Sequence, residues 1–240
     1  MGALVGSRVV DLAGLVGHPA FPSTLEALIA RPRGTVLDAA RAALEREDEL
    51  DDWTVRAPRL LAPILPPSLS DDDDRWITAP AGEVVRPPMN GDIRFDVEIA
   101  AVIFRPKKPK LKPSDAGACI FGYTLMQSWL TDEAFAAALG PCIVTADEFD
   151  PEEEVVAHVN GKMWSAGKVA DAVVSFEHQI VDAARTAELL PGEVFGSGTL
   201  GRIHPDRKPP RTGAEVRIEH PSIGVLENRV GPRARRVKAS

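Results

Sequence analysis

Residues 94–104, which read RFDVEIAAVIF, constrain the fold of this chain more than any other stretch. The run is apolar almost throughout and rich in β-branched and aromatic side chains, which favours a buried strand. Asp96 and Glu98 interrupt it two residues apart, so on a strand both carboxylates point to the same face. Like charges on one face repel unless something lies between or beside them. That partner can be water, a metal ion, a basic side chain or a substrate, and the sequence leaves all four possibilities open.

Several short strands are predicted after this run. Asn160-Gly161 is a typical two-residue hairpin turn, so residues 154–167 are expected to form a β-hairpin. Short strands separated by glycines and turn residues favour a closed or rolled mixed sheet. The other strands are expected over 118–126 and 141–149 and in the stretches EVFGSGT, EVRIEH and GVLENRV.

Helical patterns are fewer than strand patterns. In the first sixty residues, a predicted strand over 7–13 is followed by predicted helices over 22–32 and 35–48. Further along, a short helix is predicted over 131–139. An amphipathic helix is predicted over 172–190, because a Pro-Gly pair follows it and terminates the pattern.

Composition divides the chain into four parts. Residues 1–60 form a small α/β segment, and residues 61–91 form a proline-rich acidic connection, interpreted as a shortened lid. Residues 92–231 carry the β-rich pattern, and residues 232–240 form a basic tail. The acidic run at 71–74 and the basic tail are interpreted as solvated. A weak cation contact is the alternative for the run, and an anion or nucleic-acid contact for the tail.

Charge and hydropathy argue against several classes of protein. The formal net charge is −7, so nothing global indicates nucleic-acid binding. No apolar run approaches the ~18 residues that a membrane span needs. The opening residues lack the basic start of a signal peptide, and Cys119 and Cys142 have neither disulfide-type nor metal-type spacing. We therefore expect a cytoplasmic protein with buried thiols and with neither a membrane nor a nucleic-acid partner.

Six short motifs, in this order, resemble the fumarylacetoacetate hydrolase family over residues 7–231. The resemblance implies an α+β, β-rich fold: a mixed β-sandwich roll, usually a homodimer, with an active site at its mouth. Members bind Mg²⁺ or Mn²⁺ with a 2-oxo acid or 1,3-dicarbonyl compound, and act as C–C hydrolases, decarboxylases, hydratases or tautomerases. The motifs are FDVEIAAVI (95–103), FGYTL (121–125), LGPCIVTADEF (139–149), VNG (159–161), LLPGEVFGSGTLG (189–201) and IGVLENRV (223–230).

The resemblance assigns metal binding to Asp96 and Glu98. Hard oxygen ligands that face one way from a strand suit Mg²⁺. The third carboxylate of the family pattern falls on Ser128, and the preceding Asn of that pattern falls on Gln127. Because a neutral hydroxyl removes one negative charge from the site, Mg²⁺ or Mn²⁺ is possible here as a cofactor but doubtful.

Other groups that the family pattern carries are also missing. Residues 66–91 contain no histidine to match the catalytic histidine of the lid, and residues 130–140 contain no lysine to match the electrophilic lysine. General acid–base catalysis contributes about 10²- to 10⁴-fold to a rate, so losing the base, the lysine and the third ligand together argues against conventional hydrolysis.

Candidate roles follow for the residues that remain. Without a metal, two carboxylates on one face of a semi-apolar pocket are expected to hold one proton between them, which raises one pKa. The Ser-Gly-Thr at 197–199 matches a family pattern that contacts substrate oxygens, and glycine permits close backbone approach. We assign catalysis to Asp96, Glu98, Ser128 and His204, and substrate binding to Tyr123, Gln127, Ser197, Gly198, Thr199 and Arg202.

Three hypotheses cover these observations. The favoured one is a divergent enzyme acting on a 1,3-dicarbonyl or 2-oxo acid through an enol or enolate, by tautomerisation, decarboxylation, cyclisation or dehydration. The second is a conventional metal-dependent C–C hydrolase or decarboxylase that draws its missing groups from the acidic residues 70–74 or from a partner subunit. The third is a catalytically inactive binding or assembly subunit.

Overall fold

The computed structural model describes residues 1–31, 34–67, 75–78, 81–86, 92–104, 111–130, 135–201 and 208–233. The chain divides into two compact units, Met1–Arg59 and Leu60–Ser240. Each unit has its own hydrophobic cluster, so each is described by itself.

The first unit combines a two-stranded antiparallel sheet with short helices. The strand β2 ends at Asp11, earlier than the predicted strand over 7–13, because α1 begins at Leu12. The predicted helices over 22–32 and 35–48 form with narrower bounds. Its elements are β1 (Gly2–Val5), β2 (Arg8–Asp11), α1 (Leu12–Val16), α2 (Leu25–Ile29), α3 (Thr35–Leu44) and η1 (Glu47–Glu49), and Val10, Leu15, Ala43 and Leu50 form its buried cluster.

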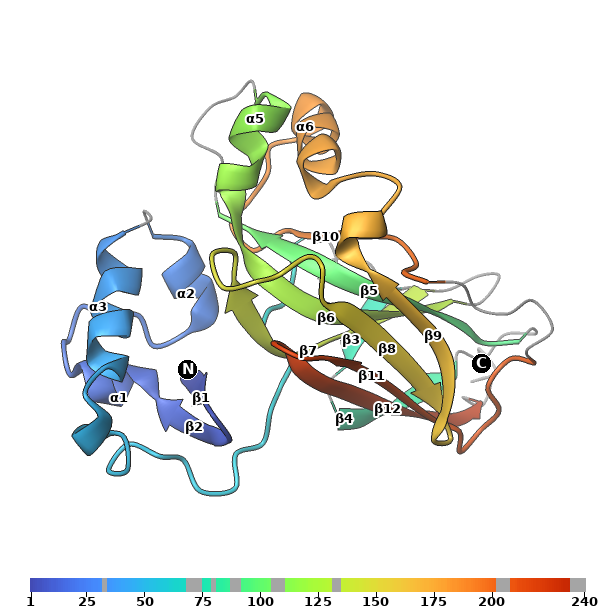
Figure 1. Cartoon of the computed structure of the whole chain (residues 1–240), viewed down its shortest axis with the longest axis horizontal. Coiled ribbons are helices and arrows are strands. Elements are labelled where there is room, and N and C mark those ends of the chain that lie inside the picture. The colour runs from blue at the N-terminus through green and yellow to red at the C-terminus, as the bar shows by residue number, and fades with distance from the viewer. Residues whose placement is uncertain are drawn as a thin grey trace, which may run out of the picture. The chain divides into compact units, whose positions relative to one another are not determined.

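The second unit contains two five-stranded sheets (Figure 1). The strand order in the first sheet is β10-β5-β6-β7-β3, and in the second sheet it is β4-β12-β11-β8-β9. Neighbours are antiparallel except for β3 with β7 and β4 with β12, which are parallel, so both sheets are mixed. The first sheet comprises β3 (Arg75–Thr78), β5 (Arg94–Ile103), β6 (Ile120–Leu130), β7 (Phe135–Thr145) and β10 (Val194–Gly196). The second comprises β4 (Ala81–Arg86), β8 (Glu154–Val159), β9 (Lys162–Lys168), β11 (Glu215–His220) and β12 (Gly224–Arg233).

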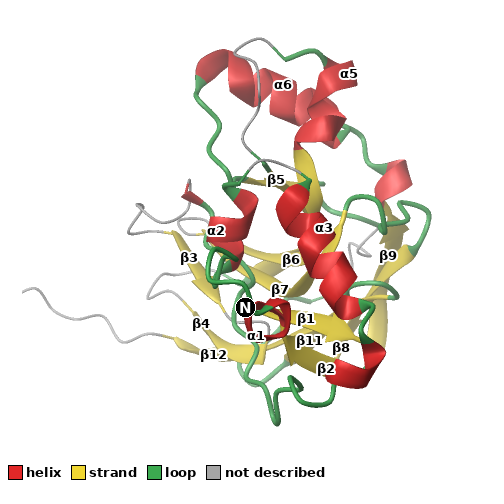
Figure 2. Ribbon diagram, turned by 90° about the vertical axis from the view of Figure 1, so that its left-hand side faces the viewer, coloured by secondary structure: helices red, strands yellow, loops and turns green. Residues whose placement is uncertain are grey.

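The hydrophobic core of this unit lies between the two sheets. Alternate residues of β5, including Val97 and Ile99, are fully buried in it together with Ile218 of β11 and Leu226 of β12. The helices α5 (Pro113–Ala116) and α6 (Phe176–Thr186) lie together at one end of the sheets, and Phe176 joins the same core (Figures 1 and 2). The expected α+β, β-rich fold class is confirmed.

The predicted helix over 131–139 is wrong. The described part of that stretch is the beginning of β7, which extends from Phe135 to Thr145. The same strand includes residues 141–145 of the strand predicted over 141–149. Ala136, Ala137 and Ala138 are at most 1% exposed, because β7 pairs with β6 on one side and β3 on the other. Alanine favours helices in isolation, but burial between two strands outweighs that preference.

Other predicted bounds change less. The helix predicted over 172–190 forms as α6 only from Phe176, after the short η3 (Val169–Asp171), and the EVFGSGT strand is limited to β10. The hairpin of β8 and β9 turns at Asn160-Gly161 as predicted. The acidic run at 71–74 and residues 234–240 of the basic tail lie outside the described residues. No helix within the described ranges is long and apolar enough to cross a membrane.

Gln127 is a polar side chain that is buried within the core. Gln127 of β6 pairs in register with Val97, so it lies on the inner face of the first sheet, and it is 0% exposed. Neither its amide nitrogen nor its amide oxygen has a hydrogen-bond partner in the part of the chain that the structure describes. A buried polar group without a partner costs about 1–3 kcal/mol of folding free energy.

We expect Gln127→Met to raise the free energy of unfolding by about 1–3 kcal/mol, because it removes unpaired polar atoms at nearly constant volume. Urea unfolding monitored by tryptophan fluorescence measures this. Thr124→Val is the matched control: Thr124 is equally buried but donates to the Cys142 carbonyl at 2.7 Å, so its replacement should destabilise the protein. A loss of stability in Gln127→Met would mean that the amide is satisfied in solution.

Candidate active site

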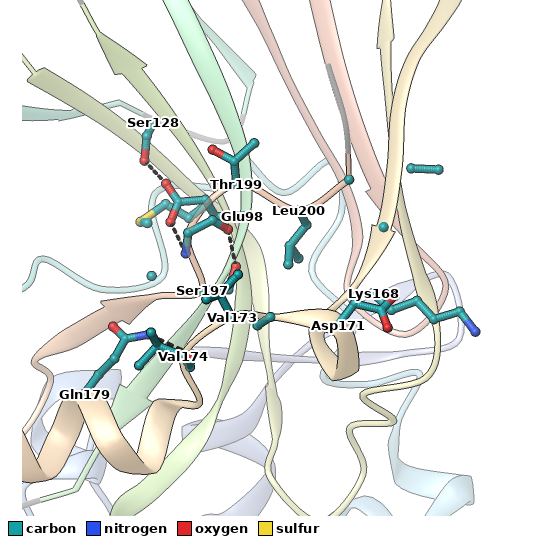
Figure 3. Close-up of a pocket in the computed structure, with 17 residues that line it drawn as sticks. Glu98, Ser128, Lys168, Asp171, Val173, Val174, Gln179, Ser197, Thr199 and Leu200 are labelled. Carbon is teal, nitrogen blue, oxygen red and sulfur yellow. Dashed lines mark hydrogen bonds between the residues drawn. The ribbon is translucent and has the colours of Figure 1, made fainter. Parts of the chain in front are cut away.

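A cleft of about 740 Å³ lies against the outer face of the first sheet (Figure 3). Its floor is formed by Glu98 of β5 together with Met126 and Ser128 of β6. Its walls come from β9, from the segment after β10, and from the connection between η3 and α6. Elements distant in sequence therefore meet around one carboxylate.

Glu98 is held by hydrogen bonds to both of its carboxylate oxygens. The Ser128 hydroxyl donates to Oε1 at 2.5 Å, and the Gly198 backbone N–H donates to Oε2 at 3.0 Å (Figure 3). The side chain is only 8% exposed. Two donors, one from a neighbouring strand and one from a loop, thus fix the carboxylate at the floor of the cleft.

The register of β5 and β6 places the two acids beside the serine. Asp96 pairs with Ser128, and Glu98 pairs with Met126, so all four side chains share the outer face. A Cβ atom on Gly196 of the adjoining β10 would lie 2.4 Å from Glu98 Oε2. A side chain at that position would force the Glu98 carboxylate and the end of Met126 to shift.

Residues 197–200 form an arch over the edge of β5. The Ser197 N–H donates to the Ile99 carbonyl at 2.8 Å, and the Leu200 N–H donates to the Val97 carbonyl at 2.7 Å. Gly198 lies between these anchors with φ +73°, a conformation that favours glycine. The arch therefore directs the Gly198 N–H at Glu98 and leaves Thr199 exposed in the cleft.

The arch is held from its other side by β9. The Ser165 hydroxyl donates to the Leu200 carbonyl at 3.1 Å. A Cβ atom on Gly201, at the end of the arch, would lie 2.2 Å from the Ala166 carbonyl oxygen. Close backbone packing of this kind leaves the arch little room to shift, so the Gly198 donor has a fixed position.

Burial controls the charge of Glu98. Its removal from water raises the pKa of the carboxyl above the ordinary value of 4.5, and the nearby charge of Asp96 raises the pKa further. The hydrogen bonds from Ser128 and Gly198 lower the pKa but do not cancel these effects. The site therefore holds a proton more readily than an exposed glutamate does.

The structure brings five of the predicted site residues together: Glu98, Ser128, Ser197, Gly198 and Thr199 all line the cleft. Asp96 lies on the same face of β5 and is partly buried, but it is not part of the cleft wall. Arg202 and His204 lie outside the described residues.

Tyr123 and Gln127 lie on the inner face of the sheet, away from the cleft. Tyr123 pairs with Ala101 and stacks on Phe149 with ring centroids 4.2 Å apart. Burial and the charge of Glu177 raise the pKa of Tyr123 to about 12. Because successive strand residues face opposite ways, Gln127 and Ser128 cannot both reach the cleft.

Sequence reasoning missed the wall opposite the floor. Asp171 lines the cleft from the end of η3, Val173 and Val174 line it from the connection between η3 and α6, and Lys168 lines it from β9. The Val-Val pair just before the N-cap residue Ser175 was the only local signal, and apolar residues there are also typical of ordinary helix packing.

The donor set around Glu98 does not match the ligands that a divalent cation needs. Within the described ranges, no group of three or more acidic, histidine or cysteine side chains is arranged to hold a metal ion. Asp96 and Glu98 share a face, but the third position is the neutral Ser128 hydroxyl, which donates to Glu98. Because this third group is neutral and brings no negative charge, these residues do not fit a three-carboxylate site.

We expect Glu98→Gln to stabilise the protein at neutral pH. Because the folded pKa of Glu98 is raised, the folded state keeps a proton that the unfolded state loses above pH 4.5, so stability falls as pH rises through this window. The amide avoids that cost. Urea unfolding at pH 4 and pH 7.5 should show a gain that is larger at pH 7.5.

Glu154→Gln serves as the control, because Glu154 is an exposed carboxylate at the start of β8. It should change stability little at either pH. An equal effect of Glu98→Gln at both pH values would contradict the raised pKa.

Known proteins are similar to this chain in sequence and in fold. Residues 35–231 match the family described as fumarylacetoacetate (FAA) hydrolase C-terminal. Human mitochondrial oxaloacetate tautomerase FAHD2A is 31% identical over 64% of this chain, and the chain covers 55% of that protein. The mitochondrial oxaloacetate tautomerase Fahd2a of Rattus norvegicus is 26% identical over 94% of this chain and 85% of its own. The chain thus spans about half the length of the human relative.

A solved structure shows the same fold. Maleylpyruvate hydrolase from Sphingobium sp. SYK-6, in complex with manganese(II) and pyruvate, superposes with a TM-score of 0.75 over 97% of this chain and 96% of its own, at 21% identity. The family match covers more than half of the chain. This protein therefore belongs to the fumarylacetoacetate hydrolase family.

Proposed function

We propose that this protein catalyses keto–enol tautomerisation of a 2-oxo acid or 1,3-dicarbonyl compound, with Glu98 as the group that transfers the proton. The observation that carries the proposal is the buried Glu98 carboxyl, whose pKa is raised and which lies at the floor of a cleft. Tautomerisation needs one well-placed proton carrier, and this site supplies one.

Glu98 has two properties that suit a general base, a raised pKa and a fixed position. A carboxylate with a pKa near its ordinary value is a weak base, and burial is a common way to bring a carboxyl pKa closer to working pH. The Ser128 and Gly198 donors hold both oxygens in place, so little reorganisation is needed when the proton moves. These contacts hold the carboxylate in position, and each oxygen still has a further lone pair that can accept a proton.

The proposed reaction moves one proton and one electron pair. The Glu98 carboxylate takes a proton from the carbon beside the substrate carbonyl, and the electrons of that C–H bond form the C=C bond while the carbonyl π electrons move to oxygen. Thr199, exposed in the cleft beside Glu98, is the hydroxyl donor that we assign to this oxygen (Figure 3). Return of the proton from Glu98 to oxygen completes the enol, and the reverse sequence forms the ketone.

We assign no step to a metal ion. The solved maleylpyruvate hydrolase binds manganese(II), but here the third position beside Asp96 and Glu98 is a neutral, 2%-exposed serine. A bound dication would also lower the pKa of Glu98 and so weaken it as a base. The relatives support the class of reaction, since two of them are oxaloacetate tautomerases.

The proposal is tested by following the loss of enol absorbance of freshly dissolved oxaloacetate and phenylpyruvate with and without a chelator. We expect catalysis that survives the chelator, and a fall of about 10²- to 10⁴-fold in kcat for Glu98→Gln. Glu154→Gln is the matched control and should retain full activity. Full activity in Glu98→Gln would rule out the role of this residue, and a complete loss on chelation that Mn²⁺ restores would favour metal-dependent chemistry.

The surroundings of Glu98 predict pH shifts of opposite sign. Ser128→Ala removes a hydrogen bond that lowers the Glu98 pKa, so the pH midpoint of kcat should move up. Asp96→Asn removes a charge that raises the same pKa, so the midpoint should move down. Both pH–rate profiles, with an NMR titration of ¹³C-labelled Glu carboxyls, measure these shifts, and movement in the same direction would contradict the assignment.

A further inference from the structure

The far wall of the cleft exposes apolar side chains that the proposed reaction does not use. Val173 is 99% exposed, the highest fraction among the large apolar residues described, and the adjoining Val174 is 48% exposed. Both line the cleft (Figure 3). Leu200 of the arch also borders it, but this side chain is only 3% exposed and packs in the core. An exposed apolar wall continuous with a reacting site indicates a ligand that covers it.

The segment that carries these valines is anchored at both ends. Before it, the Ala172 N–H donates to the Val169 carbonyl at 3.0 Å. After it, Gln179 of α6 donates to the Val174 carbonyl at 3.4 Å, and Ser175 bonds to His178 at 2.9 Å. The valines are therefore presented by a fixed segment.

The size of the cleft exceeds what an oxo acid head group needs. A volume of about 740 Å³ lies in the range of roughly 300–1,000 Å³ that encloses drug-sized ligands. Glu98, Ser128 and Thr199 gather on one side of this space, and Val173 and Val174 lie at the other (Figure 3). Room for a substituent thus remains between the reacting carbon and the valines.

Charge near the valines disfavours a second acid group there. Asp171 lines the cleft two residues before Val173, so a carboxylate placed at this wall would meet a like charge. Lys168 also lines the cleft, but its ammonium lies 3.7 Å from Glu152 and points away from Glu98 (Figure 3). An uncharged, apolar substituent meets neither difficulty.

We propose that the substrate is a 2-oxo acid or 1,3-dicarbonyl compound that carries an alkyl or aryl substituent, and that Val173 and Val174 bind this substituent. The inference rests on the proposed function for the position of the head group. It adds that a monoacid with an apolar side chain is preferred over a dicarboxylic acid of the oxaloacetate kind.

The test compares phenylpyruvate, which has an aryl substituent, with oxaloacetate, which has a second carboxylate, as enol substrates of the whole chain. We expect kcat/KM to be at least about tenfold higher for phenylpyruvate. Val173→Asp should lower kcat/KM for phenylpyruvate by about tenfold, mainly through KM, because a buried apolar contact of this size has that magnitude. Val173→Ser, which removes the apolar surface without adding a charge, should lower kcat/KM for phenylpyruvate but change oxaloacetate little.

Val225→Asp is the matched control: Val225 is 37% exposed on β12, is absent from the cleft wall and should affect neither substrate. A preference for oxaloacetate, or no effect of Val173→Asp on phenylpyruvate, would overturn this inference and leave the proposed function intact. A change in sedimentation coefficient of Val173→Asp would also overturn it, because the valines would then bind a second copy of the chain.

Binding separates failure of the inference from failure of the proposed function. If neither compound reacts, calorimetric titration of both into the Glu98→Gln variant decides the matter. In one outcome, phenylpyruvate binds more tightly than oxaloacetate and loses about tenfold in affinity in Val173→Asp. This result would support the apolar binding site, although the tautomerase proposal would have failed. If phenylpyruvate binds no more tightly than oxaloacetate, the proposed apolar binding site would be contradicted as well.

Discussion

The burial of one carboxylate, Glu98, is the constraint on which the site depends. Taking a carboxylate out of water is costly unless donors replace the lost solvent. Here one donor comes from the strand beside it and the other from a residue one hundred positions away. The arch at 197–200, the glycine at 196 and the packing of Gly201 on β9 all serve to bring that second donor within reach. Loss of any of them would leave the charge less compensated.

The strand β5 contributes to both the core and the site, because its successive side chains point to opposite faces of the sheet. One face supplies Val97 and Ile99 to the core between the sheets, and the other face supplies Asp96 and Glu98 to the outer side. Stability and chemistry are thus built on the same backbone, which explains why a polar site has so rigid a support. The same alternation separates Gln127 from Ser128, although they are neighbours in sequence.

Much of the fold could be predicted from local pattern, and the site only in part. The apolar run of β5, the Asn160-Gly161 hairpin and the α+β class follow from periodicity and turn chemistry, whereas the alanine run of β7 was misread because pairing on two sides overrides propensity. The shared face of Asp96 and Glu98 follows from strand geometry. Applying that geometry to 123–128 would also have placed Tyr123 and Gln127 on the inner face. The arch and the Val173 wall depend on contacts between distant segments, which local pattern does not contain.

Two carboxylates on one face can be reconciled with burial in two ways, and the two have opposite chemical consequences. A dication between them favours the ionised form, lowers both pKa values and uses their lone pairs as ligands. A shared proton has the opposite consequence. The pair keeps this proton to a higher pH, because two ionised carboxylates would repel, and the protonated group can then give and take a proton. Ser128 contributes no third negative charge, which weakens the case for a dication, although its hydrogen bond to Glu98 favours the ionised form. The burial of Glu98 and the charge of Asp96 are what favour the proton. The protonation state of Glu98, which its burial and the neighbouring Asp96 control, therefore determines what the cleft can do, and the fold alone does not.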